Sequence, residues 1–196
     1  MSTSNVEAPT PPTLSRRIVS IAVFLIGALT TCFLVGERQI LVALPILVVL
    51  ATMNIALAPR RLAAARFALW AGIAGVFVEM VLAMFHLTAF RIVSAKYPLM
   101  PPLWLLGLWS LFGSIVPTAF GPLQTRPKAA ALIGALGAPL AYLAAVKLNA
   151  LGFGVFGDSG PNPAISLIGI AIVWAGVLPG LLLLSRKIDR VADWAD

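Results

Sequence analysis

Long apolar runs separated by short polar stretches dominate the chain. A helix of about 20 apolar residues crosses a bilayer core about 30 Å thick, and each run is close to that length. The runs lack the alternation of barrel strands, so helices are favoured as the way to satisfy the backbone within hydrocarbon. The pattern predicts an all-α fold, a six-span transmembrane helix bundle. The expected spans lie near residues 18–36, 39–58, 67–90, 101–121, 129–151 and 164–185.

The segments outside these runs are too short for a soluble domain. Residues 1–17 are polar and contain prolines, so we expect a disordered cytoplasmic tail there. Residues 18–186 are expected to form a single transmembrane domain, and residues 187–196 a second cytoplasmic tail.

Basic residues are unevenly divided between the two ends of the expected spans. One side carries Arg38, Arg91 and Lys96. The other carries Arg16, Arg17, Arg60, Arg61, Arg66, Arg126, Lys128, Arg186, Lys187 and Arg190. Since cytoplasmic loops of membrane proteins are rich in Lys and Arg, this split predicts that both termini are cytoplasmic.

Composition agrees with this interpretation. The chain is 60% hydrophobic and 11% charged, whereas soluble domains carry roughly a quarter charged residues. The formal net charge of +7 sits at the span ends rather than in one patch, so we expect no nucleic-acid partner. The single cysteine, Cys32, excludes an intrachain disulfide.

Glu79 is the most informative residue, because it falls near the middle of the expected third span. An unpaired ionised side chain there costs at least about 2.5–3.5 kcal/mol. The carboxyl must therefore be neutral, or meet a cation or several hydrogen-bond donors. Gly72, Gly75, Ala83 and His86 recur at helical spacing on the same face, which should point inward. A functional site and a structural hydrogen bond between helices both remain open.

Several polar and aromatic residues of other expected spans lie at about the same level of the bilayer as Glu79 or outward of it. The candidate ligand-binding residues are Glu79, His86, Trp104, Trp109, Tyr142 and Lys147. Simpler roles remain for three of them: an interfacial hydrogen bond for His86, an aromatic belt for Trp104 and snorkelling for Lys147. Depth alone does not decide whether these side chains face one another.

Motifs of known chemistry are missing from the sequence. It contains no phosphate-binding loop, nucleophile elbow, HExxH or paired His–carboxylate set. His86 is the only histidine, so we expect no metal site and no cofactor.

Two helices carry a resemblance to a known family. Pro102, Trp104 and Trp109 form one pattern, and Gly134, Gly137, Pro139, Leu140 and Tyr142 form a second. Together they resemble the bacterial membrane-protein family catalogued as domain of unknown function 2878. The resemblance covers roughly residues 18–186 and implies an acidic residue in the preceding span, which matches Glu79.

The chain departs from this family in two places. Members often have Asn-His near the end of the tryptophan helix, where this chain has Pro117 and Thr118. The usual acidic residue is aspartate rather than glutamate. Family genes tend to lie beside genes for enzymes that modify fatty acids, so the resemblance implies a role in membrane-lipid metabolism in the bacterial inner membrane.

The leading hypothesis is an accessory membrane protein that holds a lipid-like ligand near Glu79 and is not itself an enzyme. Its expected partners are membrane lipids, lipid-modifying enzymes or a second copy of the chain. The alternatives are a membrane-embedded lipid-modifying enzyme that uses Glu79 or His86, a small transporter, and a structural subunit of a membrane complex.

Overall fold

Six α-helices account for most of the described residues. A computed structural model describes residues 12–58, 60–90, 100–154 and 162–192, with side chains as far as Ile188. The helices are α1 (Leu14–Gly36), α2 (Ile40–Ala56), α3 (Arg61–Met84), α4 (Leu103–Ala119), α5 (Pro127–Lys147) and α6 (Pro163–Ala192). A short 3-10 helix, η1 (Gly121–Thr125), joins α4 to α5. The predicted all-α fold is confirmed.

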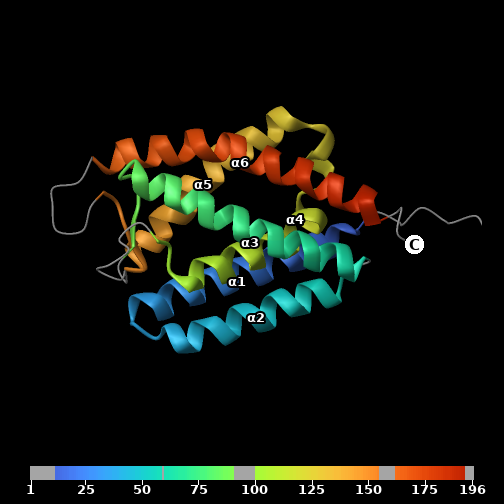
Figure 1. Cartoon of the computed structure of the whole chain (residues 1–196), viewed down its shortest axis with the longest axis horizontal. Helices are drawn as coiled ribbons and strands as arrows, with labels where there is room; N and C mark the ends of the chain where they lie inside the picture. Colours follow the sequence, from blue (N-terminus) through green and yellow to red (C-terminus); the bar gives the residue numbers. More distant parts are fainter. Residues whose placement is uncertain (1–11, 59, 91–99, 155–161, 193–196) are drawn as a thin grey trace, which may run out of the picture.

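Successive helices run in opposite directions and lie in layers (Figure 1). The α1–α2 pair forms one side of the bundle, α3 and α4 the middle, and α5 with α6 the other side. The start of α1, the α2–α3 turn, η1 and the end of α6 share one end, which we call the basic end. The α1–α2 turn and the ends of α3 and α5 share the other, which we call the strand end.

Helix α4 is the centre of the bundle, because it packs against α1, α2, α3 and α6. Its buried residues include Trp104 and Trp109. Small residues allow the α3–α4 approach: a Cβ on Gly113 would meet Ala68 and Ala71 of α3. Such close backbone contact is how helices associate where no water drives them together.

The strand end is held by a two-residue ladder and by tight helix ends. Strand β1 (Ala89–Phe90) pairs antiparallel with β2 (Leu151–Gly152), which links the segments after α3 and α5. Two residues after the end of α1, α3 and α5 stands a residue of positive φ: Arg38, His86 and Asn149. At His86 the amide donates to Ala83 O and the next amide, of Leu87, donates to Leu82 O. This is the Schellman arrangement, which satisfies the last carbonyls of a helix.

The outer surface of the bundle is apolar. Exposed large hydrophobic side chains occur on every helix, among them Leu41, Trp70, Phe77, Leu136 and Ile172. Four helices, α1, α3, α5 and α6, are long and apolar enough to cross a membrane, whereas α2 and α4 are shorter apolar helices. These helices indicate insertion into a membrane.

Helix boundaries differ most from the expected spans at α1, α3, α5 and α6. Helix α5 ends at Lys147 rather than at residue 151, where β2 begins. Helix α3 occupies residues 61–84 rather than 67–90, because the alanine-rich segment after Arg61 is a good helix former and the Schellman turn ends the helix at Met84. Helix α1 begins at Leu14, inside the segment expected to be disordered, with Thr13 Oγ1 accepting from Arg16 N. Helix α6 continues to Ala192, through most of the expected C-terminal tail.

Some expectations fall on residues outside the described part of the chain. These are the tail at residues 1–11, the end of the chain at residues 193–196, and the basic residues Arg91 and Lys96.

Candidate functional site

Glu79 lies on the buried face of α3. Its side chain is 2% exposed, and Gly72, Gly75 and Ala83 are buried on the same helix. The expectation that this small-residue face points inward is confirmed for these four residues, whereas His86, predicted to share the face, is exposed. Because α3 ends at Met84, Glu79 lies about 8 Å from the helix end rather than at its middle.

Two hydrogen-bond donors from two other helices meet the Glu79 carboxyl. Trp109 of α4 donates its Nε1–H to Oε1 at 3.1 Å. The Tyr142 hydroxyl of α5 donates to the same oxygen at 2.5 Å. These bonds tie α3, α4 and α5 together at one atom, and a hydrogen bond to a carboxyl in apolar surroundings is stronger than one in water.

The second carboxyl oxygen, Oε2, is buried and has no hydrogen-bond partner within the described residues. A buried polar atom without a partner costs about 1–3 kcal/mol, so such atoms call for an explanation. Both donors bond to Oε1, so Oε2 keeps its full capacity to form hydrogen bonds. The carboxyl can therefore accept from, or donate to, one further group.

Aromatic packing fixes the Trp109 indole in place. It stacks on Trp174 of α6 with ring centroids 4.9 Å apart and planes at 21°. Phe112 meets it edge-on at 6.1 Å and 89°. The absence of a side chain at Gly75 makes room, because a Cβ there would collide with the indole. The donor therefore points at Glu79 in one orientation.

Trp174 also packs in this centre, although it is not among the candidate residues named from the sequence. Its Nε1 is buried without a hydrogen bond of ordinary geometry, although its indole lies near the Tyr142 hydroxyl. Its position in the sequence indicates a buried side chain, because Trp174 is too far from both ends of α6 to belong to an interfacial aromatic belt. Which neighbour it faces depends on packing between α5 and α6, which periodicity does not specify.

Glu79, Trp109 and Tyr142 converge, and the other three candidates do not join their hydrogen bonds. Trp104 is buried in the same apolar cluster as Tyr142, so it supports the centre by packing. His86 is exposed in the turn after α3, since the helix ends before it reaches that position. Lys147, the last residue of α5, is also exposed.

Chemically, the centre is a single carboxyl with hydrogen-bonding neighbours. Within the described residues no group of three His, Cys, Asp or Glu side chains could hold a metal ion. Of the two described side chains that donate to Glu79, Tyr142 is titratable and Trp109 is not. The arrangement is suited to holding a polar group of a ligand through Oε2, or to joining helices.

A family model described as a protein of unknown function, DUF2878, matches residues 17–180. No curated protein and no solved structure matches the chain.

Proposed function

Because the chain belongs to the DUF2878 family, whose function is unknown, we propose a role from its own geometry. The chain is a six-span protein of the cell (inner) membrane of a bacterium. It holds a lipid-like ligand at Glu79 and acts as an accessory protein in membrane-lipid metabolism. The observation that carries this proposal is the buried Oε2 without a partner, next to an oxygen that accepts two hydrogen bonds.

Six spans are supported by helix length and direction. Helices α2 and α4 have 17 residues each, which is about the shortest length that crosses a bilayer core. Successive helices alternate in direction (Figure 1). An even number of alternating spans leaves both termini on the same side.

Charge supports the cytoplasmic position of the basic end. Arg16 and Arg17 stand at the start of α1, Arg60 and Arg61 before or at the start of α3, and Arg186 near the end of α6. The strand end holds Arg38 and Lys147 in the described residues. A positive end of this kind faces the cytoplasm and its anionic leaflet.

A lipid-like ligand fits the surroundings of Glu79 better than a polar solute does. The carboxyl is buried, and its two donors, Trp109 and Tyr142, belong to clusters of buried apolar residues against which Trp174 also packs. A ligand that reaches Oε2 must itself be largely apolar and offer one hydroxyl or amide donor. Membrane lipids and their biosynthetic intermediates have that character.

The test is to identify lipids retained by the purified protein. Full-length chain is extracted in a mild detergent, and bound molecules are identified by native mass spectrometry and lipid analysis. Glu79→Gln keeps an oxygen that accepts from Trp109 and Tyr142 but replaces Oε2 with an amide nitrogen. We expect a specific lipid species to be retained by the unmodified chain and lost from Glu79→Gln.

Glu37→Gln is the matched control, since Glu37 is exposed in the α1–α2 turn. It should retain the lipid unchanged. Equal lipid content in all three proteins would overturn the proposed ligand and leave Glu79 as a joint between helices. Conversion of the bound lipid by the purified protein, or flux of a solute in proteoliposomes, would instead favour the enzyme or the transporter.

A further inference from the structure

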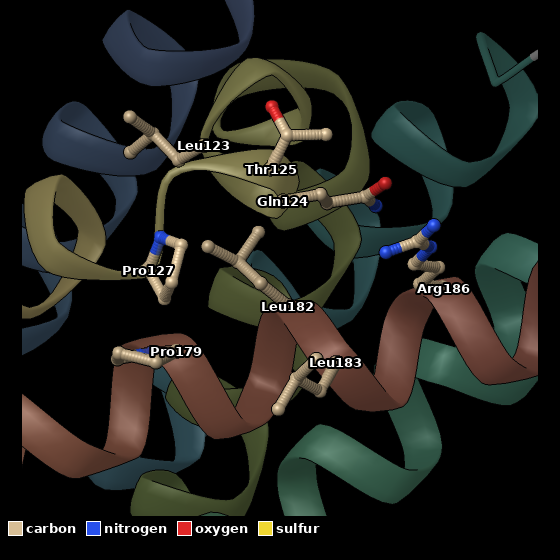
Figure 2. A pocket seen from close by; sticks show the side chains of 8 residues that line it. All are labelled: Leu123, Gln124, Thr125, Pro127, Pro179, Leu182, Leu183 and Arg186. Atoms are coloured by element: carbon tan, nitrogen blue, oxygen red, sulfur yellow. The ribbon is translucent and has the colours of Figure 1, made fainter.

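A second feature lies at the basic end, away from Glu79. A cavity of about 410 Å³ opens between η1, the start of α5 and the second half of α6. Figure 2 shows its lining residues: Leu123, Gln124, Thr125, Pro127, Pro179, Leu182, Leu183 and Arg186. This volume lies within the range of small-molecule sites. We call it the η1 groove.

The lining of the η1 groove divides into an apolar part and a polar edge. Leu123, Pro127, Pro179 and Leu182 surround the apolar part, and the side chains of Gln124 and Arg186 reach the same edge (Figure 2). Leu183 also lines the groove and is 61% exposed. The apolar part is therefore continuous with the apolar outer surface of α6.

Arg186 offers an available positive charge at that edge. Its side chain is exposed and makes no hydrogen bond or ion pair with the described residues. The guanidinium carries five N–H donors in a planar fork that matches phosphate oxygens. Gln124 adds an amide that can donate alongside it.

The start of α5 adds a second positive element. Pro127 is the first residue of α5 and lines the groove, and no side chain caps this helix end. The helix dipole favours negative charge near this helix start, which lies across the groove from Gln124 and Arg186 (Figure 2). Arg126 and Lys128 flank the same turn and increase the local positive charge.

We propose that the η1 groove binds a phospholipid with an anionic headgroup. The acyl chain lies against the leucines and prolines, and the phosphate pairs with Arg186 and Gln124 at the polar edge of the groove. An apolar groove with a cationic edge at one end of a membrane bundle is complementary to an amphiphile of this kind. The inference depends on membrane insertion, and it is independent of the ligand proposed for Glu79.

The experiment measures the affinity of the full chain for phosphatidylglycerol in a neutral detergent by native mass spectrometry. Phosphatidylcholine is the neutral-headgroup comparison, and glycerol phosphate is the headgroup without acyl chains. We expect phosphatidylglycerol to bind at least about tenfold more tightly than either. Arg186→Gln should weaken its binding about tenfold, with partial retention in Arg186→Lys.

Lys187→Gln is the matched control, because Lys187 is the neighbouring exposed cation and does not line the groove. It should change the affinity less than about twofold. An equal loss in Lys187→Gln, equal binding of phosphatidylcholine, or full competition by glycerol phosphate would overturn the proposal. Arg186→Gln should still retain the lipid species that depends on Glu79, so failure of the two proposed sites can be distinguished.

Discussion

At the scale of single residues, the main energetic question is how the protein compensates for burying the Glu79 carboxyl. The carboxyl leaves water entirely, and the bundle compensates with an indole and a phenol that both donate to Oε1. Each donor in turn depends on the carboxyl, because a buried indole or phenol without an acceptor is also destabilised. The three side chains therefore stabilise one another as a unit.

Replacing Glu79 should show this mutual dependence. Glu79→Ala removes the acceptor of Trp109 and Tyr142 and leaves a cavity, so we expect a loss of about 2–4 kcal/mol in the free energy of unfolding. Glu79→Gln keeps an amide oxygen as acceptor and should lose about 1 kcal/mol or less. Unfolding of the purified proteins in mixed micelles measures both. Equal losses of unfolding free energy in the two variants would mean that keeping an acceptor oxygen at position 79 does not stabilise the protein.

At His86, in contrast to Glu79, we expect one substitution to keep or increase the stability of the protein. It occupies the left-handed position that ends α3, with φ 55°, a conformation that glycine adopts without strain. His86→Gly should therefore keep or increase stability, by up to about 1 kcal/mol. His86→Val should decrease it, since a β-branched residue is disfavoured at positive φ. Thermal unfolding of the two variants compares them directly, and a marked loss in His86→Gly would show that the imidazole itself is needed.

The burial of single residues could be predicted from the sequence. An acidic residue in an apolar run must be enclosed, and Glu79 is enclosed. The prediction failed for His86, because the sequence from Phe85 to Thr88 has no glycine or proline to announce the end of α3. The turn is formed by backbone hydrogen bonds that a histidine tolerates at some cost in strain.

At the scale of helices, small residues decide how closely two axes approach. Gly75 and Gly137 make a matched pair on two apolar helices. A Cβ on Gly75 would collide with the Trp109 ring, whereas nothing lies within 4 Å of a Cβ on Gly137. The same substitution should therefore have opposite effects at the two positions.

Gly75→Ala should push α4 away from α3 and destabilise the protein by about 1–3 kcal/mol. Gly137→Ala should be neutral or stabilise by up to about 1 kcal/mol, because alanine is the better helix former. Thermal unfolding and lipid retention measured side by side report on both. Similar losses at the two positions would contradict the α3–α4 packing described above.

Helices were predictable in number and approximate place because apolar length is a strong signal. Their ends were less predictable. The segment after Arg61 is helical although it is charged at both ends, at Arg61 and Arg66, because alanines between them favour a helix with or without lipid. The partners of each helix were not predictable either, since Trp109 could reach Trp174 only once α6 packs beside α3 and α4.

At the scale of the whole molecule, the basic residues at one end of the bundle predict which turns face the cytoplasm. If the basic end faces the cytoplasm, Gln39 in the α1–α2 turn lies outside and Thr125 in η1 lies inside. In a chain with Cys32→Ala, we expect a membrane-impermeant maleimide to label Gln39→Cys in intact cells. Thr125→Cys should react only after the membrane is opened.

The reverse labelling pattern would place both termini outside and contradict the charge argument. Labelling of both positions in intact cells would contradict a six-span arrangement. Cys32 itself is buried, so the unmodified chain should remain unlabelled while folded.

The most direct test of the account is an experimental density map of the protein in a lipid bilayer, at a resolution that shows bound lipids. We expect elongated density between the helices, with a polar atom within hydrogen-bonding distance of Glu79 Oε2. Trp109 and Tyr142 should still donate to Oε1. A map in which Glu79 faces the surrounding bilayer, or in which protein side chains alone satisfy Oε2, would contradict it.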